Sequence, residues 1–483
     1  MNKKIKVLMV PSDTQGVGHF RNIWAAQSMQ KNFSEEFEVD INHEVRFNDY
    51  NLLSQYDIIH FHRQFGPYEQ FETISTELKK RGVIVVMDID DFWEPPTTHP
   101  LYEIVKSEKM TEKIITNIKF SDYITTTTEA FKSHISKLNE NIFIIPNALD
   151  MNHKMWKSEA EENLTDKVRI SWIGGSSHLH DLKLLEKSMK KLNNNPELKD
   201  KYQMIMCGFD IRGTITGLLP NGQKNVRTIK PQETVWRKFE DIFTSNFSLL
   251  GDDKEYITWL NKIKKESYEN EYNKYYVRRW TLPLTQYGKH YNFCDVCLAP
   301  LEKIETYKQL QNGELVSVLD QRPGTVKSRP HYFNEVKSEL KIIEAGMKKK
   351  VLIAQDFGIY KELIQNGVNG ILVSDNNKGW YKALREVINN KDYRETLANN
   401  LHEFVKEKYD LKNVTAQRLE IYKQLLKERD SGELDVKRKK QGEKVFSNAK
   451  KEIDKLTYKS PFGKNKPLTL QERMLQGVMK NNI

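Results

Sequence analysis

Residues 168–192 read VRISWIGGSSHLHDLKLLEKSMKKL, and the fold prediction starts from this pattern. The first six residues are a short β-branched run of the kind that forms a buried strand. Gly174 and Gly175 then make a tight turn, after which apolar residues recur at helical spacing over 182–192. A strand, a turn and an amphipathic helix in this order predict the first unit of an alternating α/β domain.

Similar runs occur on both sides of this unit, and longer helix-compatible segments separate them. Before residue 150 the strand-like runs are 5–10, 56–61, 83–87, 123–126 and 142–145. After residue 192 they are 203–207, 295–299, 351–354 and 370–373. Strands that alternate with helices form parallel sheets with helices on both faces. We therefore predict the α/β class, with one Rossmann-like domain over residues 1–150 and a second over residues 165–400.

Several segments depart from this alternation. Residues 209–276 combine aromatic and charged residues and are predicted to form a helical insertion in the second domain, whereas residues 302–332 are expected to be a mobile loop. Residues 401–430 regain helical periodicity and are expected to pack back toward the N-terminal domain.

The C-terminal residues 431–483 hold 13 Lys or Arg and 6 Asp or Glu, a net charge of +7. We expect a basic tail that is loosely ordered or bound to a partner. Nucleic acid or an anionic membrane surface would attract such a tail, and a solubilising or structural extension is the alternative.

Composition excludes some classes of protein. The chain has 483 residues, of which 38% are apolar, enough for two hydrophobic cores. Its apolar runs are shorter than the roughly 18 residues of a membrane-spanning helix, and the first is expected to be a strand instead of a secretion signal. The cysteines, Cys207, Cys294 and Cys297, are too few for a disulfide framework, which favours a cytoplasmic protein. We interpret Cys294 and Cys297 as core residues in preference to a metal or redox pair.

The segment FNEVKSELKIIEAG, residues 333–346, gives the strongest indication of function. We expect a helix that begins near Lys337, so that its unpaired N–H groups and positive dipole end could bind a diphosphate. Lys337 and Ser338 would add a charge and a hydroxyl group to that site. Glu344 follows about 9 Å further along the helix axis, near the span from a diphosphate to a ribose diol. The alternative is that Ser338 caps the helix and Glu344 faces water.

Motifs in both halves of the chain follow one another in the order found in a known enzyme family. In the second domain they are GSSHLHDL at 175–182, DVCLAPL at 295–301 and KSELKIIE at 337–344. In the first domain they are GVGHFR at 16–21, DIDD at 88–91 and IIPNA at 144–148. Together they resemble GT-B glycosyltransferases of the family 4 type, over about residues 1–208 and 277–425.

The resemblance implies two Rossmann-like domains that face each other across a cleft. It implies transfer of a sugar, with retention, from a UDP- or GDP-sugar on the second domain to an acceptor hydroxyl on the first, without a required metal or cofactor. The donor-binding residues carried over are Gly174, Gly175, Ser176, His178, Lys337, Ser338 and Glu344. The residues on the acceptor side are Gly16, Gly18, His19 and Arg21. The class of acceptor, whether glycan, lipid, protein or nucleic acid, stays open.

Two features depart from the family pattern. Val336 stands eight residues before Glu344, where the family commonly has a second glutamate. His178 and His180 stand where the family often has Arg and Lys to neutralise the leaving diphosphate. The basic residues that could replace them by loop closure are Arg278, Arg279, Arg322, Lys327 and Arg329.

Asp90 and Asp91 are the predicted catalytic residues. They follow a strand, at the edge where open α/β sheets bind ligands, and could orient or polarise an acceptor hydroxyl. The equally weighted alternative is a carboxylate that caps the next helix. Asp88 and Asp90 also imitate a metal-binding Asp-x-Asp pair, against which the two Rossmann-like patterns argue. The weaker candidates near the same edge are His19, His60 and His62.

Other functions stay open at this point. A non-catalytic binding or assembly protein could keep the same fold, as the departures at Val336 and His178 allow. A related GT-B epimerase or phosphorylase would use the same nucleotide or phosphate site. A DNA-modifying glycosyltransferase would use the basic tail to hold its substrate.

Overall fold

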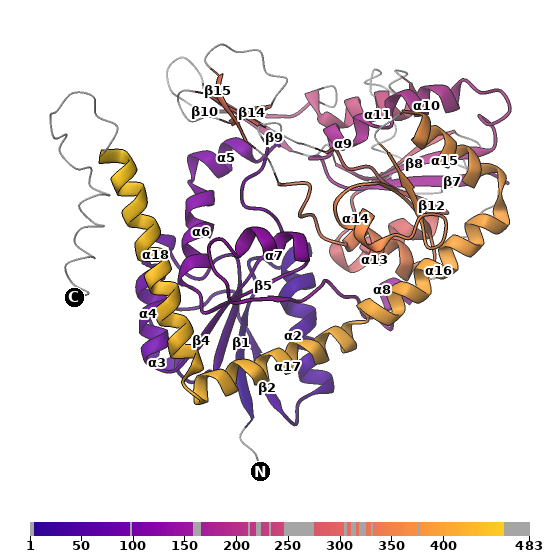
Figure 1. The fold of residues 1–483 in the computed structure, drawn as a ribbon. Helices are drawn as coiled ribbons and strands as arrows, with labels where there is room; N and C mark the ends of the chain where they lie inside the picture. The colour runs from indigo at the N-terminus through magenta and orange to yellow at the C-terminus, as the bar shows by residue number, and fades with distance from the viewer. Residues whose placement is uncertain are drawn as a thin grey trace.

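The computed structural model describes residues 4–96, 99–157, 166–210, 213–218, 224–230, 233–245, 275–303, 307–310, 315–317, 325–329, 332–374 and 377–457. They form two α/β domains, each built on a six-stranded parallel sheet. The C-terminal helices run from the second domain back to the first (Figure 1). Within these ranges we find no helix that is long and apolar enough to cross a membrane.

Domain one has a sheet with the strand order β2-β1-β3-β4-β5-β6. The strands are β1 (Ile5–Val10), β2 (Phe37–Ile41), β3 (Ile58–His62), β4 (Ile84–Asp88), β5 (Tyr123–Thr126) and β6 (Ile142–Ile144). The helical segments are α1 (Gly16–Gly18), the π-helical η1 (His19–Ile23), α2 (Trp24–Asn32), α3 (Tyr50–Leu53), α4 (Phe71–Lys80), α5 (Tyr102–Ser107), α6 (Met110–Phe120) and α7 (Glu129–Ile135). Strands β3, β4 and β5 are buried along their whole length because separate apolar clusters cover the two faces of the sheet.

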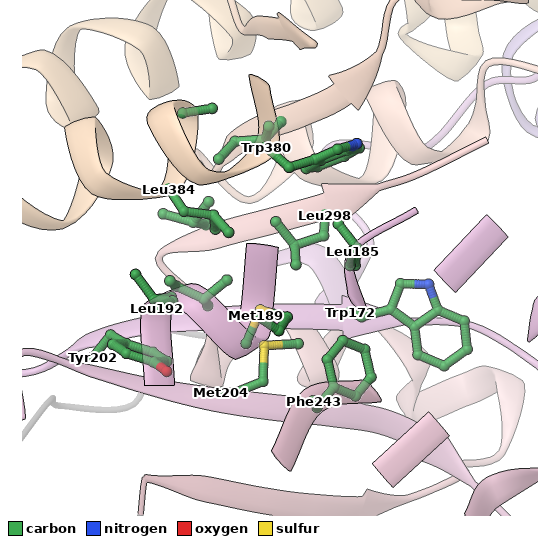
Figure 2. Packing of buried hydrophobic residues seen from close by; sticks show 14 of the residues in the cluster. Trp172, Leu185, Met189, Leu192, Tyr202, Met204, Phe243, Leu298, Trp380 and Leu384 are labelled. Carbon is green, nitrogen blue, oxygen red and sulfur yellow. The ribbon is translucent and has the colours of Figure 1, made fainter. Parts of the chain in front are cut away.

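Domain two repeats this design with the strand order β11-β8-β7-β12-β16-β17. The strands are β7 (Val168–Ile173), β8 (Tyr202–Phe209), β11 (Tyr276–Trp280), β12 (Val296–Ala299), β16 (Val351–Gln355) and β17 (Ile371–Val373). The helical segments are α8 (Lys154–Lys157), α9 (Leu179–Lys183), α10 (Glu186–Asn193), α11 (Val235–Thr244), the 3₁₀-helical η6 (Leu284–Phe293), α13 (Leu340–Met347), α14 (Gly358–Leu363), α15 (Asn377–Asn389) and α16 (Lys391–Tyr409). Trp172, Met204 and Trp380 pack together in one face of its core (Figure 2).

The predicted strands of both domains are confirmed to within two residues at each end. The two six-stranded sheets confirm the α/β class. Strands β2 and β11 were not predicted. β2 alternates buried and exposed residues at an edge of its sheet, and β11 contains two arginines.

The expected helical insertion over residues 209–276 is wrong for the part that the structure describes. α11 connects β8 to β11, and its Trp236, Phe239 and Phe243 are buried in the core of domain two. It is therefore a crossover helix of the main sheet. Strands β9 (Thr214–Leu218) and β10 (Lys224–Thr228) form a hairpin before it, and residues 246–274 lie outside the described residues.

The mobile loop expected over residues 302–332 is also wrong where the chain is described. Strands β13 (Tyr307–Leu310), β14 (Leu315–Ser317) and β15 (Thr325–Arg329) form an antiparallel sheet in the order β14-β13-β15. Antiparallel pairing over short polar strands leaves little hydrophobic periodicity in the sequence, which explains the error.

Residues 391–430 lead the chain from domain two back to domain one. α16 packs on α13 of domain two, where Gly346 leaves room for Val405. At Asp410 the chain crosses to domain one, and the backbone of Leu149 bonds to both neighbours of that residue. α17 (Leu411–Asp430) then lies along α2 of domain one. Of the residues expected to pack back toward the N-terminal domain, 401–430, those of α17 do so, whereas residues 401–409 remain on domain two.

The first part of the basic tail is a docked helix, α18 (Glu433–Thr457), which lies against domain one (Figure 1). Arg438 Nε and Nη2 donate to the two carboxylate oxygens of the buried Asp122 at 2.9 and 3.0 Å. Lys440 and Lys444 pair with Glu140. The expectation of a loosely ordered tail is therefore wrong for α18, because acidic residues distant in sequence hold it. Residues 458–483 lie outside the described residues.

Arg438→Met is expected to lower the free energy of unfolding by about 2 kcal/mol, because Asp122 would stay buried with Lys79 and without the bidentate arginine. The melting temperature should fall by roughly 4 to 8 °C in a calorimetric scan. Lys440→Met is the control, since its ion pair with Glu140 is exposed and should leave the melting temperature almost unchanged. Equal, small shifts in both variants would show that Asp122 does not anchor α18.

Candidate functional site

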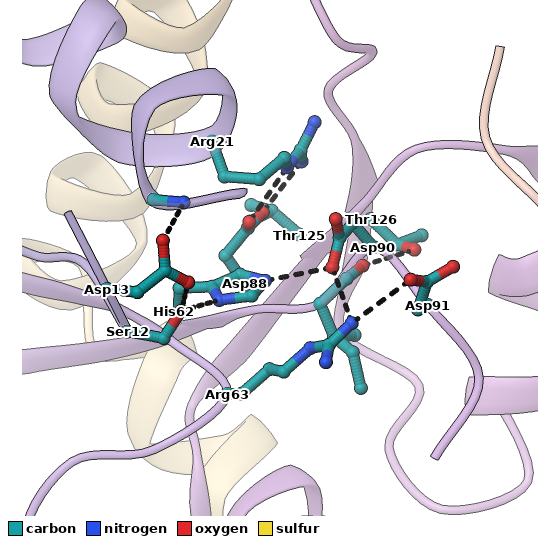
Figure 3. Close-up of polar contacts among 12 residues, drawn as sticks. Ser12, Asp13, Arg21, His62, Arg63, Asp88, Asp90, Asp91, Thr125 and Thr126 are labelled. Carbon is teal, nitrogen blue, oxygen red and sulfur yellow. Dashed lines mark hydrogen bonds and ion pairs between the residues drawn. The ribbon is translucent and has the colours of Figure 1, made fainter. Parts of the chain in front are cut away.

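Strands β1, β3 and β4 of domain one end at the same edge of the sheet, where charged side chains gather (Figure 3). Arg21 is fully buried and donates to both carboxylate oxygens of the buried Asp88, at 2.9 and 2.7 Å. Burial raises the pKa of Asp88, but the Arg21 guanidinium outweighs it and holds that pKa well below its usual range. Arg21, which was expected on the acceptor side of the cleft, is therefore held within domain one. It could affect a ligand only through the residues that it contacts.

Asp90 lies beside this pair and accepts from His62 Nε2 and Arg63 Nη2, both at 2.9 Å. Burial raises the pKa of Asp90, and the charge of Arg63 outweighs this effect, so the carboxyl group stays ionised. His62 Nε2 donates in this contact, and its Nδ1 lies 2.7 Å from the Ser12 hydroxyl, which donates its own proton to Asp13 Oδ2 at 2.9 Å. Ser12, His62 and Asp90 form a hydrogen-bonded relay that can orient a hydroxyl group at this edge.

Asp91 is partly exposed and reaches toward domain two. Its carboxylate oxygens lie 3.5 Å from Arg63 Nη2 and 3.2 Å from Lys337 Nζ. The next helix, α5, has no side-chain cap, so the alternative that Asp90 or Asp91 caps it is wrong. The two aspartates have different surroundings: Asp90 is enclosed by domain one, and Asp91 meets a cation of domain two.

The turn after β1 contains two of the expected acceptor-side glycines. The Gly18 amide donates to Asp13 Oδ1 at 3.1 Å, and a Cβ at Gly18 would lie 1.8 Å from the Asp13 carbonyl oxygen. A glycine is therefore required at position 18 by packing. Around Gly16 the described atoms leave space for a side chain, and His19 is partly exposed with its ring against Trp24.

Domain two reaches domain one through residues 332–339, which we call the clasp. The Tyr332 ring lies 3.9 Å from the His134 ring, and Val336 is fully buried in the core of domain one. Lys337 forms the ion pair with Asp91. α13 begins at Leu340, so the expected helix start near Lys337 is wrong. Lys337 and Ser338 lie before the helix because the clasp residues pack against the other domain.

Glu344 lies within α13 and is buried. Its Oε2 accepts from the Tyr291 hydroxyl at 2.5 Å and from Lys341 Nζ at 3.2 Å, and the Tyr287 hydroxyl lies 3.5 Å away. The alternative that Glu344 faces water is therefore wrong. All three contacts fall on Oε2 of the carboxylate.

The turn after β7 holds the other donor candidates. A Cβ at Gly174 would lie 2.6 Å from the Trp172 ring, so this glycine is required by packing. A Cβ at Gly175 would have no described atom within 4 Å of it, and both Gly175 and Ser176 are exposed. Gly175 and Ser176 are therefore the residues of this turn whose backbone a phosphate could approach.

A small cavity separates this turn from the clasp and from domain one. His178 Nδ1 lies 2.8 Å from Asp181 at its wall, and Asp181 also accepts from the Glu302 amide. Its volume of about 30 Å³ is far below the several hundred Å³ of ordinary ligand pockets. The cavity is lined by Pro96, His99, Ser177, His178, His180, Asp181, Glu302, Phe333, Asn334 and Lys337.

His99 is a candidate that the sequence interpretation missed. Its ring packs against Phe333 of the clasp, with the ring centres 5.3 Å apart. Burial, together with the charges of Lys337 and His178, lowers the pKa of His99 to about 4. The available signal was its position shortly after Asp91, in a proline-containing loop without periodicity.

Of the basic residues considered as substitutes for the diphosphate clamp, the two whose side chains the structure describes, Arg278 and Arg279, are not among the residues that line the cavity. Arg278 pairs with the buried Glu240, and Arg279 lies 3.4 Å from the centre of the Phe293 ring. The side chains of the three others, Arg322, Lys327 and Arg329, lie outside the described part of the structure.

The two motifs considered for metal or redox chemistry have other surroundings. Asp88, the first residue of the Asp-x-Asp pair, is held by Arg21. Within the described ranges we find no group of three or more His, Cys, Asp or Glu side chains arranged to bind a metal ion. Cys294 and Cys297 are buried free thiols in the core of domain two, with their Sγ atoms 3.2 Å apart.

Solved structures with the same arrangement of domains supply the name of the fold. A glycosyltransferase from Rickettsia africae is similar with a TM-score of 0.51 and 15% identity, over 88% of this chain and 100% of that one. Sucrose-phosphate synthase from Thermosynechococcus elongatus is similar with a TM-score of 0.50 and 13% identity, over 88% and 99%. The chain has a GT-B fold. Anabaena HepE in complex with UDP-glucose is similar to this GT-B chain with a TM-score of 0.50 and 11% identity, over 87% and 100%.

Neither the protein-family models nor the curated proteins include a significant match to the chain. The GT-B assignment therefore rests on the two sheets and their similarity to solved structures. Within that fold the cavity lies between the domains, because Pro96 and His99 come from domain one and the rest of its lining comes from domain two.

Proposed function

We propose that the chain is a glycosyltransferase that moves a sugar from a nucleotide diphosphate sugar to an acceptor hydroxyl. The observation that carries this proposal is the contact of Lys337, a cation from the segment before α13, with Asp91 at the ligand-binding edge of domain one. His99 and His178 line the same cavity. The bound UDP-glucose named for HepE supports a UDP-sugar as the first donor to test.

The proposed roles follow from charge and position. Lys337, with Ser338, Gly175 and Ser176, holds the diphosphate and stabilises its negative charge as the sugar leaves. Glu344 holds the ribose through Oε1 of its carboxylate, since its contacts with Tyr291, Lys341 and Tyr287 fall on Oε2. Asp91 orients the acceptor hydroxyl once Lys337 turns to the donor. We propose retention of the anomeric configuration, which NMR of the first-formed product would test.

A nucleotide sugar that is the donor is expected to stabilise the full chain by about 2.7 kcal/mol when present at 100 times its dissociation constant. For domains of this size the melting temperature should rise by roughly 5 to 10 °C. UDP- and GDP-sugars are compared in a thermal-shift screen, with the free hexose and the nucleoside monophosphate as controls. Slow release of UDP or GDP from the stabilising compound supports a transferase. Failure of every nucleotide sugar to raise the melting temperature would contradict the proposal and favour the assembly protein.

Arg438, Lys440 and Lys444 pair with acids of domain one, so these side chains are engaged within the chain and do not favour nucleic acid as the substrate.

A further inference from the structure

Glu339, the last residue of the clasp, points its carboxylate into domain one. The residue is 1% exposed, and its Oε1 accepts from the Asn147 backbone amide at 2.6 Å. Its Oε2 is equally buried and has no hydrogen-bond donor in the described part of the chain. A buried carboxylate oxygen without a donor destabilises a structure. A glutamate at this position therefore indicates a function that offsets the loss of stability.

Asn147 connects Glu339 to the buried ion pair of domain one. Asn147 Oδ1 accepts from Arg21 Nη1 at 3.2 Å, and Arg21 in turn holds both oxygens of Asp88. α13 begins at the residue after Glu339. A continuous series of contacts therefore runs from the start of α13 in domain two to the edge of the domain-one sheet.

The hydrogen bond from Asn147 does not itself require a carboxylate. A glutamine amide oxygen would accept the same N–H, and its neutral side chain would be easier to bury. What the carboxylate adds is a charge that depends on pH. Burial raises the pKa of Glu339 to about 7, although hydrogen bonds from its own amide and from Asn147, and the charge of Arg21, oppose this.

The charged and titratable groups that face Glu339 come from two elements. Arg21 belongs to η1, and Lys408 and Tyr409 belong to the end of α16. Arg21 keeps its charge, and burial raises the pKa of Tyr409, so neither changes its protonation near neutral pH.

We propose that Glu339 is a positioning residue whose contact with Asn147 sets the closure of the cleft, and thereby the placement of Lys337 and Ser338 against domain one. When the domains separate, Glu339 reaches water and its pKa returns toward the ordinary 4.5. When they close, the carboxylate takes up a proton from solvent. Protonation of Glu339 therefore stabilises the closed form fully below pH 4.5. This stabilisation is lost as the pH rises through 7. The claim that closure promotes catalysis rests on the proposed function, whereas the effect of Glu339 on closure does not.

The expected effect is large enough to measure. A change of the Glu339 pKa from 4.5 to about 7 lowers the closure equilibrium constant about 70-fold between pH 5 and pH 8. Two interface histidines act in the opposite direction, because burial lowers the pKa of His99 and of His134 to about 4. The ratio of the closure constants of the wild type and Glu339→Gln at each pH removes these contributions, since both proteins retain the histidines.

Closure can be followed in the full chain without any ligand. Donor and acceptor dyes on Glu112→Cys in domain one and Lys187→Cys in domain two report it by energy transfer, because both positions are exposed and the native cysteines are buried. The ratio of wild type to Glu339→Gln should fall about 70-fold from pH 5 to pH 8. A ratio that stays within about twofold across this range would overturn the proposal. Thermal melts at each pH show whether both proteins remain folded.

The rate of donor hydrolysis gives a second readout with the same pair of proteins. The wild-type kcat should fall relative to that of Glu339→Gln as the pH rises, in step with the closure ratio. Glu339→Asp, whose shorter side chain reaches less far toward Asn147, should close less at every pH, whereas Glu339→Gln restores closure. If closure follows pH as expected and no nucleotide sugar is hydrolysed, the role of Glu339 stands and the proposed function fails.

Discussion

Arg21→Met is expected to lower the free energy of unfolding by about 3 to 5 kcal/mol, because it leaves the carboxylate of Asp88 buried without its bidentate cation. Both side chains of this pair are completely inaccessible to solvent. The same substitution removes the donors to Ile145 O and to the Asn147 side chain, at the point where the chain leaves domain one. The loss therefore combines an unpaired buried charge with two broken hydrogen bonds.

Calorimetry would show this loss as a fall in melting temperature of roughly 6 to 20 °C. Arg429→Met is a matched control, because Arg429 pairs with Asp57 at a partly exposed site and should contribute less than about 1 kcal/mol. If the two arginine variants melt at the same temperature, the Arg21–Asp88 pair does not hold domain one together.

Lys337→Met is expected to lower kcat for donor cleavage about 100- to 1000-fold, the usual effect of removing one group that stabilises charge in a transition state. Lys337 is the clasp cation at the cavity wall, and in the closed form it lies 3.2 Å from Asp91. Methionine is an unbranched side chain of similar length that removes the charge, and with it the contact of Lys337 Nζ with the Phe333 ring. The fold should therefore persist while the rate falls.

Lys361→Met on α14 controls for the loss of one positive charge at an exposed position, and it should leave kcat unchanged. Steady-state assays of both variants with the donor found in the thermal-shift screen provide the comparison. A normal kcat in Lys337→Met would mean that the diphosphate is neutralised elsewhere, and the role proposed for Lys337 would have to be abandoned. Melting curves of both variants establish that any loss of rate is not a loss of folded protein.

Two failures of the sequence interpretation have a common origin in contacts between distant residues. β11 was missed because Arg278 suggests an exposed segment, whereas its charge is paired with Glu240 of α11. α18 was expected to be loosely ordered because its charges suggest a solvated tail, whereas Arg438 meets the buried Asp122. The sequence alone does not show whether a charged side chain forms an ion pair with a residue distant in the chain.

The sequence was sufficient for what depends on local pattern. Strand β4, buried on both faces, is apolar up to its last residue, and the alternation of such strands with helices led to two parallel sheets. The tertiary structure was needed for the site. It showed that the clasp packs on domain one, that α13 begins at Leu340, and that Glu339 reaches Asn147. Periodicity indicates which faces of an element are buried. Which residue pairs with a buried charge depends on how both domains fold.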